Sequence, residues 1–482
     1  MKKNFLLLFL LIIVPILFAI WIYGFSHLIA NGDFSRWFGG NDKPPKTNYS
    51  DLSTGSSIIY SEEDSNIKIE AILGNDKLST KDKEGYLLVA LSGKDIKATH
   101  KRVPLNLSIV IDRSGSMRGE KLEYVKDAVK QAARKLNSDD SVTLVVYDDK
   151  VETLYSSQGR FDLARFNRIV DGIESGGSTY LEGGLREGIL RVSNNEVEDK
   201  INRVILLSDG LANVGVSDSQ KLANITEQLV GGDIVVSTIG VGADYDERLM
   251  TSIARAGSGN YYFLESPEQS NNIFVQEFSD AMQVVASDIE VEFGSSDFIE
   301  IVEGVGYDLS SKSKFYPHSL GANQQQIYLF KYQIKAGESL EPLQTNIVNL
   351  QVKYKDSLNV RRELDPVRVG AKVVSSSVNL LNDDRVYEEY IRSYQAEQLW
   401  QVYDELDKNK NDEAKKNLDS LLIELEDANT RLDGKLDEDI TAVKDKQKYI
   451  DSLGSQHVNE SATGRIFQKS NQNDSYQIMY NK

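Results

Sequence analysis

Short apolar runs alternate with amphipathic stretches between Pro104 and about Val285, and this alternation limits the fold more than any other feature of the chain. The first run is Leu105–Ile111. The stretch Lys121–Leu136 follows it with apolar residues at three- and four-residue spacings, which is typical of an amphipathic helix. Strands that alternate with helices predict a mostly parallel sheet covered on both faces. The sequence therefore predicts a doubly wound α/β domain over residues 104–285.

The same alternation predicts the other elements of this domain. Two of the strands are separated only by Asp148-Asp149-Lys150, which favours a hairpin with a solvated acidic turn. The expected strands are Ser141–Tyr147, Val151–Tyr155, Arg203–Ser208, Ile234–Gly240 and Tyr261–Leu264, and the expected helices lie near Asp162–Ile173, Tyr180–Val192, Ser219–Val230, Asp246–Ala256 and Pro267–Val285.

Three loops at one edge of the predicted sheet carry oxygen ligands. They are Asp112-Arg113-Ser114-Gly115-Ser116, Gly176-Gly177-Ser178-Thr179 and Ser208-Asp209-Gly210. Ligands of such sheets bind beyond the carboxyl ends of the strands, so we expect the loops to converge there. Carboxylate and hydroxyl oxygens suit a hard divalent cation, which leaves further coordination positions to water or to a partner. A simpler interpretation is that Asp112 and Ser114 only cap the helix that follows.

The five side chains of these loops resemble a known metal site. Asp112-x-Ser114-x-Ser116, Thr179 and Asp209 are similar to the metal-ion-dependent adhesion site of von Willebrand factor type A (vWA) domains. The likeness covers about residues 104–285. The sequence is similar in particular to bacterial membrane-associated members of the family, in which the residues corresponding to Met117 and Gly119-Glu120-Lys121 also occur.

This resemblance implies a role for each residue. Ser114, Ser116 and Thr179 would bind the ion as inner ligands, and Asp112 and Asp209 would orient water around it. The implied ion is Mg²⁺, with Mn²⁺ or Ca²⁺ as alternatives, and an Asp or Glu carboxylate of a partner protein would fill the sixth position. The rim that meets this partner would consist of Arg113, Gly177, Ser178 and Gly210.

The composition argues against several other classes of function. A net charge of −18 repels nucleic acid, and the absence of cysteine removes disulfides, thiolate zinc sites and cysteine nucleophiles. Gly240-x-Gly242 follows a strand, but Tyr245 replaces the third glycine of a dinucleotide fingerprint, which argues against nucleotide binding. A metal-dependent hydrolase needs a general base, and Glu182 is the only candidate near the loops. We therefore expect no catalytic residues and no enzymatic activity.

The N-terminal part of the chain predicts a membrane anchor and a tether. Lys2 and Lys3 precede the uncharged stretch Phe5–Phe25, which as a helix is long enough to cross a hydrocarbon core of about 30 Å. A cleaved signal peptide is the alternative, but its apolar region is shorter, about 7–15 residues. The lysines predict a cytoplasmic N-terminus, so the chain would pass the cell membrane once, with its bulk extracytoplasmic. Residues 1–30 then form the cytoplasmic tip and membrane helix, and residues 31–57 a linker.

Strands are predicted on both sides of the α/β domain. Too few precede it to fold alone, so we expect one antiparallel β-sandwich built from residues 58–103 and 286–378, with the α/β domain inserted in it. The alternative is that the early strands add to an edge of the α/β sheet. The expected strands are Ile67–Leu73, Tyr86–Leu91, Ile289–Phe293, Phe298–Val302, Gln326–Ile334, Ile347–Tyr354 and Pro366–Lys372.

Residues 379–453 predict a helical region, and residues 454–482 a disordered tail. Apolar stripes on the first two helices predict core packing or, as the alternative, a groove for a partner. After Gly454 the chain is polar and poor in apolar residues, which is typical of disorder. The expected helices are Asp383–Leu406, Asp412–Leu432 and Asp437–Leu453.

Together these patterns predict a bacterial cell-surface protein that binds a partner without catalysis. It would serve adhesion or assembly, through a divalent ion that coordinates an acidic residue of the partner. The alternative is a regulatory or mechanical subunit of a membrane complex, in which the metal site shifts the last helix of the domain, Pro267–Val285. That alternative rests on analogy with related domains.

Overall fold

The structure of the 482-residue chain is a computed structural model. The residues that it describes are 59–79, 81–95, 104–157, 160–194, 200–209, 212–230, 234–242, 245–264, 273, 284–305, 309, 313–317, 319–335, 344–358, 360–453, 469 and 475. The predicted membrane helix, the linker and most of the predicted disordered tail lie outside these ranges. Within them, no helix is both long enough and apolar enough to span a membrane.

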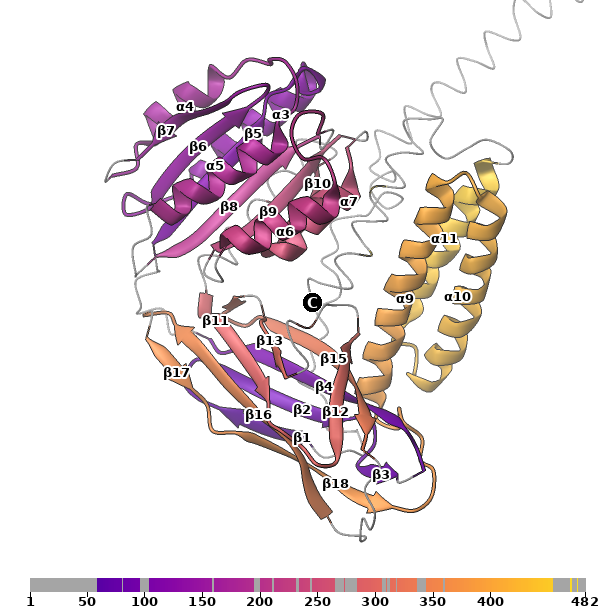
Figure 1. The fold of residues 1–482 in the computed structure, drawn as a ribbon. Helices are drawn as coiled ribbons and strands as arrows, with labels where there is room; N and C mark the ends of the chain where they lie inside the picture. The colour runs from indigo at the N-terminus through magenta and orange to yellow at the C-terminus, as the bar shows by residue number, and fades with distance from the viewer. Residues whose placement is uncertain are drawn as a thin grey trace, which may run out of the picture.

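One six-stranded sheet forms the centre of the α/β domain (Figure 1). Its strands are β5 (Leu105–Asp112), β6 (Ser141–Tyr147), β7 (Val151–Ser156), β8 (Ile201–Ser208), β9 (Ile234–Val241) and β10 (Ser258–Leu264), and its helices are α3 (Glu120–Ala133), α4 (Leu163–Asp171), α5 (Leu181–Asn194), α6 (Ser219–Val230) and α7 (Glu247–Ala256). The strand order is β10-β9-β8-β5-β6-β7, and every neighbouring pair is parallel except the hairpin β6-β7. Helices α3 and α4 pack on one face, and α5, α6 and α7 on the other. The predicted doubly wound α/β fold is confirmed.

Strand β5 carries the first candidate ligand to the edge of this sheet. Every residue of the strand is buried. Ile109 and Ile111 point into the hydrophobic cluster under α3, and Val110 points into the cluster under α5. Because a central parallel strand is covered on both faces, it reads as a continuous apolar run rather than an alternating one. The run ends at Asp112, at the carboxyl end of the strand.

Gly188 allows α5 to lie close to β5, which makes it a sensitive position. A Cβ on Gly188 would lie 2.4 Å from Cγ2 of Val110. Alanine is the better helix former by about 1 kcal/mol, but the close contact costs about 1–3 kcal/mol. We expect Gly188→Ala to lower the melting temperature in a thermal unfolding scan, whereas Ser193→Ala on the exposed side of the same helix should leave it nearly unchanged. Equal melting temperatures for the two variants would contradict the close packing.

The strands outside the α/β domain form two further sheets. They are β1 (Ile59–Glu63), β2 (Ile67–Leu73), β3 (Lys77–Ser79), β4 (Glu84–Gly93), β11 (Val284–Phe293), β12 (Ile299–Gly304), β13 (Lys314–Phe315), β14 (Leu320–Gly321), β15 (Gln325–Ile334), β16 (Gln344–Asp356), β17 (Arg361–Glu363) and β18 (Val367–Val374). One sheet has the order β1-β2-β4-β15-β12, and the other β13-β11-β16-β18-β3, with β14 beside β11 and β17 beside β16. One hydrophobic cluster, which includes Ile67, Val291 and Phe330, takes residues from both sheets.

Pairing of β4 with β15 joins the chain before the α/β domain to the chain after it. The two strands run antiparallel from Glu84 paired with Gln333 to Ser92 paired with Gln325. The alternative position of the early strands, at an edge of the α/β sheet, is therefore wrong. One pair also departs from the expected antiparallel pattern, because β3 runs parallel to β18.

The predicted helix Pro267–Val285 is wrong at its C-terminal end. Val284 and Val285 begin strand β11 and are buried. Val284 pairs with Gly321 of β14, so these valines belong to the sandwich rather than to a helix. The rest of the predicted helix lies outside the described residues, apart from Ile273.

Within the part of the chain that the structure describes, three helices follow the sandwich and lie side by side (Figure 1). They are α9 (Asp384–Asp407), α10 (Asn411–Arg431) and α11 (Asp437–Leu453). Their apolar stripes meet in one hydrophobic cluster that includes Leu399, Leu421 and Val443. The stripes on α9 and α10 thus serve core packing, and this accounts for them without a groove for a partner.

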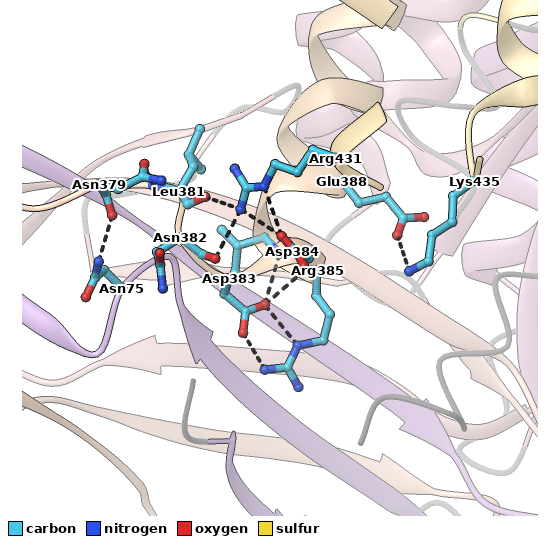
Figure 2. Close-up of polar contacts among 11 residues, drawn as sticks. Asn75, Asn379, Leu381, Asn382, Asp383, Asp384, Arg385, Glu388, Arg431 and Lys435 are labelled. Atoms are coloured by element: carbon cyan, nitrogen blue, oxygen red, sulfur yellow. Dashed lines mark hydrogen bonds and ion pairs between the residues drawn. The ribbon is translucent and has the colours of Figure 1, made fainter. Parts of the chain in front are cut away.

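A polar cluster joins this helical bundle to the sandwich (Figure 2). Asp383 caps α9 by accepting hydrogen bonds from backbone N–H groups, and its own N–H donates to the carbonyl of Gly74 at 2.9 Å. The carboxylate of Asp383 also accepts from Nε and Nη2 of Arg385 at 2.9 and 2.6 Å. Arg431 of α10 contacts Asp384 at 2.8 Å in the same cluster. The bundle is therefore attached to the sandwich at the start of α9, where Asp383 bonds to Gly74 and forms a buried ion pair with Arg385.

Two residues of the predicted disordered tail lie within the described ranges. Lys469 forms an ion pair with Glu247 of α7, and its Nζ lies 5.1 Å from the centre of the Tyr245 ring. Ser475 is buried. Lys469 is thus held by charge and cation–π contacts, and disorder of the remaining tail residues stays a prediction.

Candidate metal site

The first loop brings one carboxylate and two hydroxyls together at the end of β5. Asp112 is fully buried, and its Oδ1 accepts a hydrogen bond from the N–H of Ser114 at 2.8 Å. The hydroxyl oxygens of Ser114 and Ser116 lie 3.1 Å apart. Ser114 stands at the N-cap of the 3₁₀ helix Gly115–Met117, but its side chain caps no backbone N–H. The simpler interpretation of Ser114 as a helix cap is therefore wrong.

The second loop lies directly against the first. The N–H of Gly115 donates to the carbonyl of Gly177 at 2.8 Å, and the N–H of Gly176 donates to the carbonyl of Arg113 at 2.6 Å. Gly176 has no room for a side chain, because a Cβ there would lie 2.0 Å from Oδ2 of Asp148. Glycine at this position thus leaves room for the buried carboxylate of Asp148 beside the loop.

Thr179 ends the second loop and is buried. Its N–H donates to Oδ1 of Asn213 at 2.8 Å, and the N–H of Asn213 donates back to the carbonyl of Thr179 at 3.2 Å. These two bonds fix Thr179 between α5 and the loop that leaves β8. Its connection to the first loop runs through the backbone of Gly177 rather than through a side-chain contact among the described residues.

The third loop places a second carboxylate beside the first. The hydroxyl of Ser208, the last residue of β8, donates to Oδ2 of Asp112 at 2.6 Å. Asp209 follows and is fully buried. Its Oδ2 lies 3.3 Å from Nζ of Lys121, and its Oδ1 has no hydrogen-bond partner within the ranges that the structure describes. Gly210 lies outside the described residues.

The electrostatics of the site favour a bound cation. Burial is the main cause that raises the pKa of Asp112 to about 6; the negative charge of Asp209 adds to it, while hydrogen bonds from Ser114 and Ser208 act in the opposite direction. Burial also raises the pKa of Tyr147 well above its ordinary value, and its hydroxyl lies 3.4 Å from Asp112. Two buried carboxylates that repel each other are stabilised by a positive charge placed between them.

The residues present fit a hard divalent cation. The structure joins Asp112, Ser114 and Ser116 directly, connects Asp209 to them through Ser208, and holds Thr179 on the adjoining loop. All of these donors are oxygen atoms, which a hard cation prefers. Oδ1 of Asp209 is buried and has no hydrogen-bond partner among the described residues, so it can still accept a bond from a cation or its water. Groups of three or more His, Asp or Glu that could hold a metal are absent from the described ranges, so the hydroxyls are essential to the fit.

Arg113, which the sequence predicts at the rim of the site, pairs with two carboxylates of the chain itself. Its Nε lies 3.0 Å from Oδ2 of Asp148, and its Nη2 lies 2.7 Å from Oε1 of Glu152. The positive charge of Arg113 is thus paired within the chain. Asp148 is buried by this arrangement, so the prediction of a fully solvated acidic turn is wrong at that residue. Gly177 is exposed and Ser178 is half-buried, so both lie at the surface beside the site.

Two residues of the site, Lys121 and Tyr147, have no role in it in the sequence prediction, although Lys121 is part of the run that resembles the bacterial vWA members. Tyr147 ends β6 and lies directly opposite Asp112 in the parallel pairing of β6 with β5. That register could have been found from the two predicted strands, since both end at the same edge. Lys121 belongs to the first turn of α3, and the start of that helix just after the first loop is the signal that points to it.

Glu182, the candidate base for a hydrolase, is already engaged. Its Oε2 accepts the N–H of Val216 at 2.9 Å, and its Oε1 lies 2.8 Å from Nε of Arg186. These two contacts, the backbone one first, lower the pKa of Glu182. A carboxylate with a lowered pKa is a weak general base near neutral pH.

Comparison with known proteins identifies the α/β domain. Residues 106–277 match the family model of the von Willebrand factor type A domain. The uncharacterized protein YfbK of Escherichia coli is 28% identical over 207 residues, which are 42% of this chain and 36% of that protein. The inter-alpha-trypsin inhibitor heavy chain H3 of Homo sapiens is 28% identical over 165 residues, 33% of this chain and 18% of that protein. The matches thus span little more than a third of these relatives, or less.

Two solved structures share the fold over most of the chain. The von Willebrand factor type A protein from Catenulispora acidiphila aligns with a TM-score of 0.62 and 17% identity, covering 81% of this chain and 91% of that chain. The ArnB paralog VWA2 from Sulfolobus acidocaldarius aligns with a TM-score of 0.57 and 17% identity, covering 85% and 98%. At this identity the likeness concerns the fold alone, and its coverage extends beyond the α/β domain. Together with the family match, the sheet topology leads to one conclusion: residues 106–277 of this chain form a von Willebrand factor type A domain.

Proposed function

We propose that this protein is a membrane-anchored, extracytoplasmic module that binds a partner protein through a divalent cation held by its vWA domain. The observation that carries the proposal is the pair of buried carboxylates at the edge of the sheet. Asp112 and Asp209 are both fully buried, and Oδ1 of Asp209 has no hydrogen-bond partner among the described residues. A buried polar atom without a partner is costly unless a ligand satisfies it.

In this proposal Ser114, Ser116 and Thr179 hold the ion, and Asp112 and Asp209 orient water around it. Mg²⁺ is the ion we expect, with Mn²⁺ or Ca²⁺ as alternatives, because all donors are hard oxygen atoms. The bound ion supplies a partly shielded positive charge that attracts a carboxylate of the partner. Neutral hydroxyl ligands leave the ion more of that charge than carboxylate ligands would.

The chain's own surface supports recognition of such a carboxylate. Gly177 and Ser116 are exposed beside the buried aspartates, so the site opens toward solvent on one side. Arg113 is engaged with Asp148 and Glu152, so its charge is already neutralised within the chain and the proposed ion supplies the attraction for an acidic side chain. We propose that an Asp or Glu of the partner binds there.

Membrane anchoring is the second part of the proposal. Its support is the uncharged stretch Phe5–Phe25 behind Lys2 and Lys3, a length and flanking charge that favour a single membrane helix with a cytoplasmic N-terminus. The vWA domain, the sandwich and the helical bundle would then lie outside the cytoplasm.

A binding role rather than catalysis is consistent with the state of the nearest base. Glu182 is held by Val216 and Arg186 and has a lowered pKa. The alternative role is that the ion shifts the helix predicted at Pro267–Val285, of which Val284 and Val285 belong to strand β11. Most of that helix lies outside the described residues, and the alternative stays a prediction.

Cross-linking in intact cells that express the full chain tests the proposed binding. We expect a cross-linked adduct with a partner protein in the presence of Mg²⁺. The adduct should disappear when EDTA is added and in the Asp112→Ala variant, because both remove the bridging ion. An adduct that persists unchanged under both treatments would contradict metal-dependent recognition.

A further inference from the structure

Lys121 places an ammonium group on the second buried carboxylate of the site. Its Nζ lies 3.3 Å from Oδ2 of Asp209, whose side chain is 0% exposed. Lys121 is the second residue of α3, which begins at Glu120, so the helix fixes its position just after the first loop. The lysine side chain itself is 26% exposed, and it therefore reaches the carboxylate from the rim of the site.

Gly242 provides room for the stem of this lysine. Its φ is +76°, a conformation that favours glycine, and a Cβ there would lie 2.8 Å from Cε of Lys121. Gly242 directly follows β9, and β9 lies beside β8, which leads to Asp209. The stem of Lys121 is thus held between α3 and the carboxyl ends of these two strands.

The charges around the two aspartates show why this contact matters. Arg113, another cation at this edge, is paired with Asp148 and Glu152. Among the described residues, the ion pair with Lys121 is the one that reaches the buried carboxylates Asp112 and Asp209. A buried carboxylate without a counter-charge destabilises the folded state strongly.

We propose that Lys121 is the internal counter-cation of the metal site. It neutralises Asp209 when no divalent cation is bound, and it competes with the divalent cation for this carboxylate. The part of the inference that concerns the ion rests on the proposed function. An ammonium next to a dication opposes its binding by charge repulsion, so Lys121 weakens metal affinity while it stabilises the metal-free domain.

The variant Lys121→Met tests both effects, because it keeps the length of the stem and removes the charge. In EDTA, urea unfolding of the full chain should show an equilibrium constant for unfolding about tenfold higher than for the wild type. In a calorimetric titration with Mn²⁺, the variant should bind about three- to tenfold more tightly. Lys121→Arg, which keeps the charge, should stay near the wild type in the Mn²⁺ titration and lie between the two proteins in EDTA.

Lys130→Met is the matched control. Lys130 belongs to the same helix and has the same charge, but it pairs with Asp127 and Asp171 on the surface. We expect changes of less than about twofold in both measurements, since exposed ion pairs contribute little. The double variant K121M/D209N should regain the stability that K121M loses in EDTA, because a neutral amide needs no counter-cation. This rescue also decides the question if K121M alone does not fold.

The outcomes separate this inference from the proposed function. If the wild type binds Mn²⁺ and K121M matches K130M in both measurements, the inference fails and the proposed function stands. If the wild type takes up no Mn²⁺, the proposed function and the competition both fail. Unfolding in EDTA then decides the remaining role: K121M less stable than K130M, with rescue by D209N, supports the counter-cation, and equal stability overturns it.

Discussion

The Asp112→Ala variant should bind Mn²⁺ about 100-fold more weakly than the wild type, or not measurably, while still folding. Asp112 is buried at the end of the central strand and carries hydrogen bonds from Ser114 and Ser208. In the proposed site it orients the water around the ion and supplies half of the carboxylate charge. Loss of a group that orients metal ligands costs about 10- to 100-fold in affinity, and loss of its charge adds to this. Calorimetric titration of the purified full chain measures the change.

Asp149→Ala is the matched control for this variant. Asp149 is an exposed carboxylate in the hairpin turn at the same edge of the sheet. Its removal takes away the same charge near the site without touching the proposed coordination, so we expect an affinity within about twofold of the wild type. The Asp112 variant should also melt only slightly earlier in EDTA, because a repulsive buried carboxylate leaves together with its hydrogen bonds. Equal Mn²⁺ affinities for the two variants would contradict the role of Asp112.

The Asp383→Asn variant should lose about 3 kcal/mol of stability or more, which is the largest stability effect that we expect from a single substitution. Asp383 and Arg385 are 0% and 3% exposed, and their contacts at 2.9 and 2.6 Å form a buried ion pair at the start of α9 (Figure 2). Removal of one charge from a buried pair leaves the other without its partner and costs about 3–5 kcal/mol. Urea unfolding in EDTA, followed by circular dichroism, measures the loss.

Asp384→Asn is the control, because the neighbouring carboxylate is 55% exposed in its pair with Arg431. An exposed pair of this kind contributes about 0–1 kcal/mol. Equal losses of stability for Asp383→Asn and Asp384→Asn would contradict the buried pair.

The surroundings of Asp383 also predict the sign of a pH effect on stability. Burial acts to raise the pKa of Asp383, but its contacts with Arg385 and with backbone N–H groups outweigh burial and lower it. The ionised Asp383 therefore stabilises the fold above the pKa of the unfolded chain, about 4, and this contribution is lost as the pH falls through the lowered value.

The sequence predicted the α/β domain because its central strands are buried on both faces and read as unbroken apolar runs. β5, β6 and β8 each lie within two residues of their predicted bounds. Helix α6 has the bounds that the sequence predicts, since its apolar residues recur at helical spacing. These signals are local, and they do not depend on how distant parts of the chain meet.

Elements without such a local signal were missed. β1 is an edge strand with mixed exposed and half-buried residues, and β3 has only three residues, so neither shows an apolar alternation. Val284 and Val285 follow a stretch with helical spacing, and only their pairing with distant strands reveals that they begin β11. Pairing between strands that are far apart in the sequence does not change the local pattern of apolar residues, so that pattern cannot predict it.

The candidate site also has features that the sequence predicts and features that it does not. The three loops follow from the motif and from the rule that parallel strands end at one edge, and the structure brings these loops side by side. The partners of Arg113 could not be predicted, because Asp148 and Glu152 belong to a hairpin whose geometry decides which carboxylate it meets. The contact of Lys121 with Asp209 could not be predicted for a related reason: it needs the space left by Gly242, far along the chain.

Anomalous diffraction at the manganese edge, from crystals of the protein grown with Mn²⁺, tests the shared metal site most directly. We expect one strong peak within bonding distance of the Ser114 and Ser116 hydroxyls, with Thr179 beside it and with Asp112 and Asp209 reached through water. Crystals without a peak among these five residues, or with the ion bound elsewhere on the chain, would contradict the proposed site and the function that depends on it.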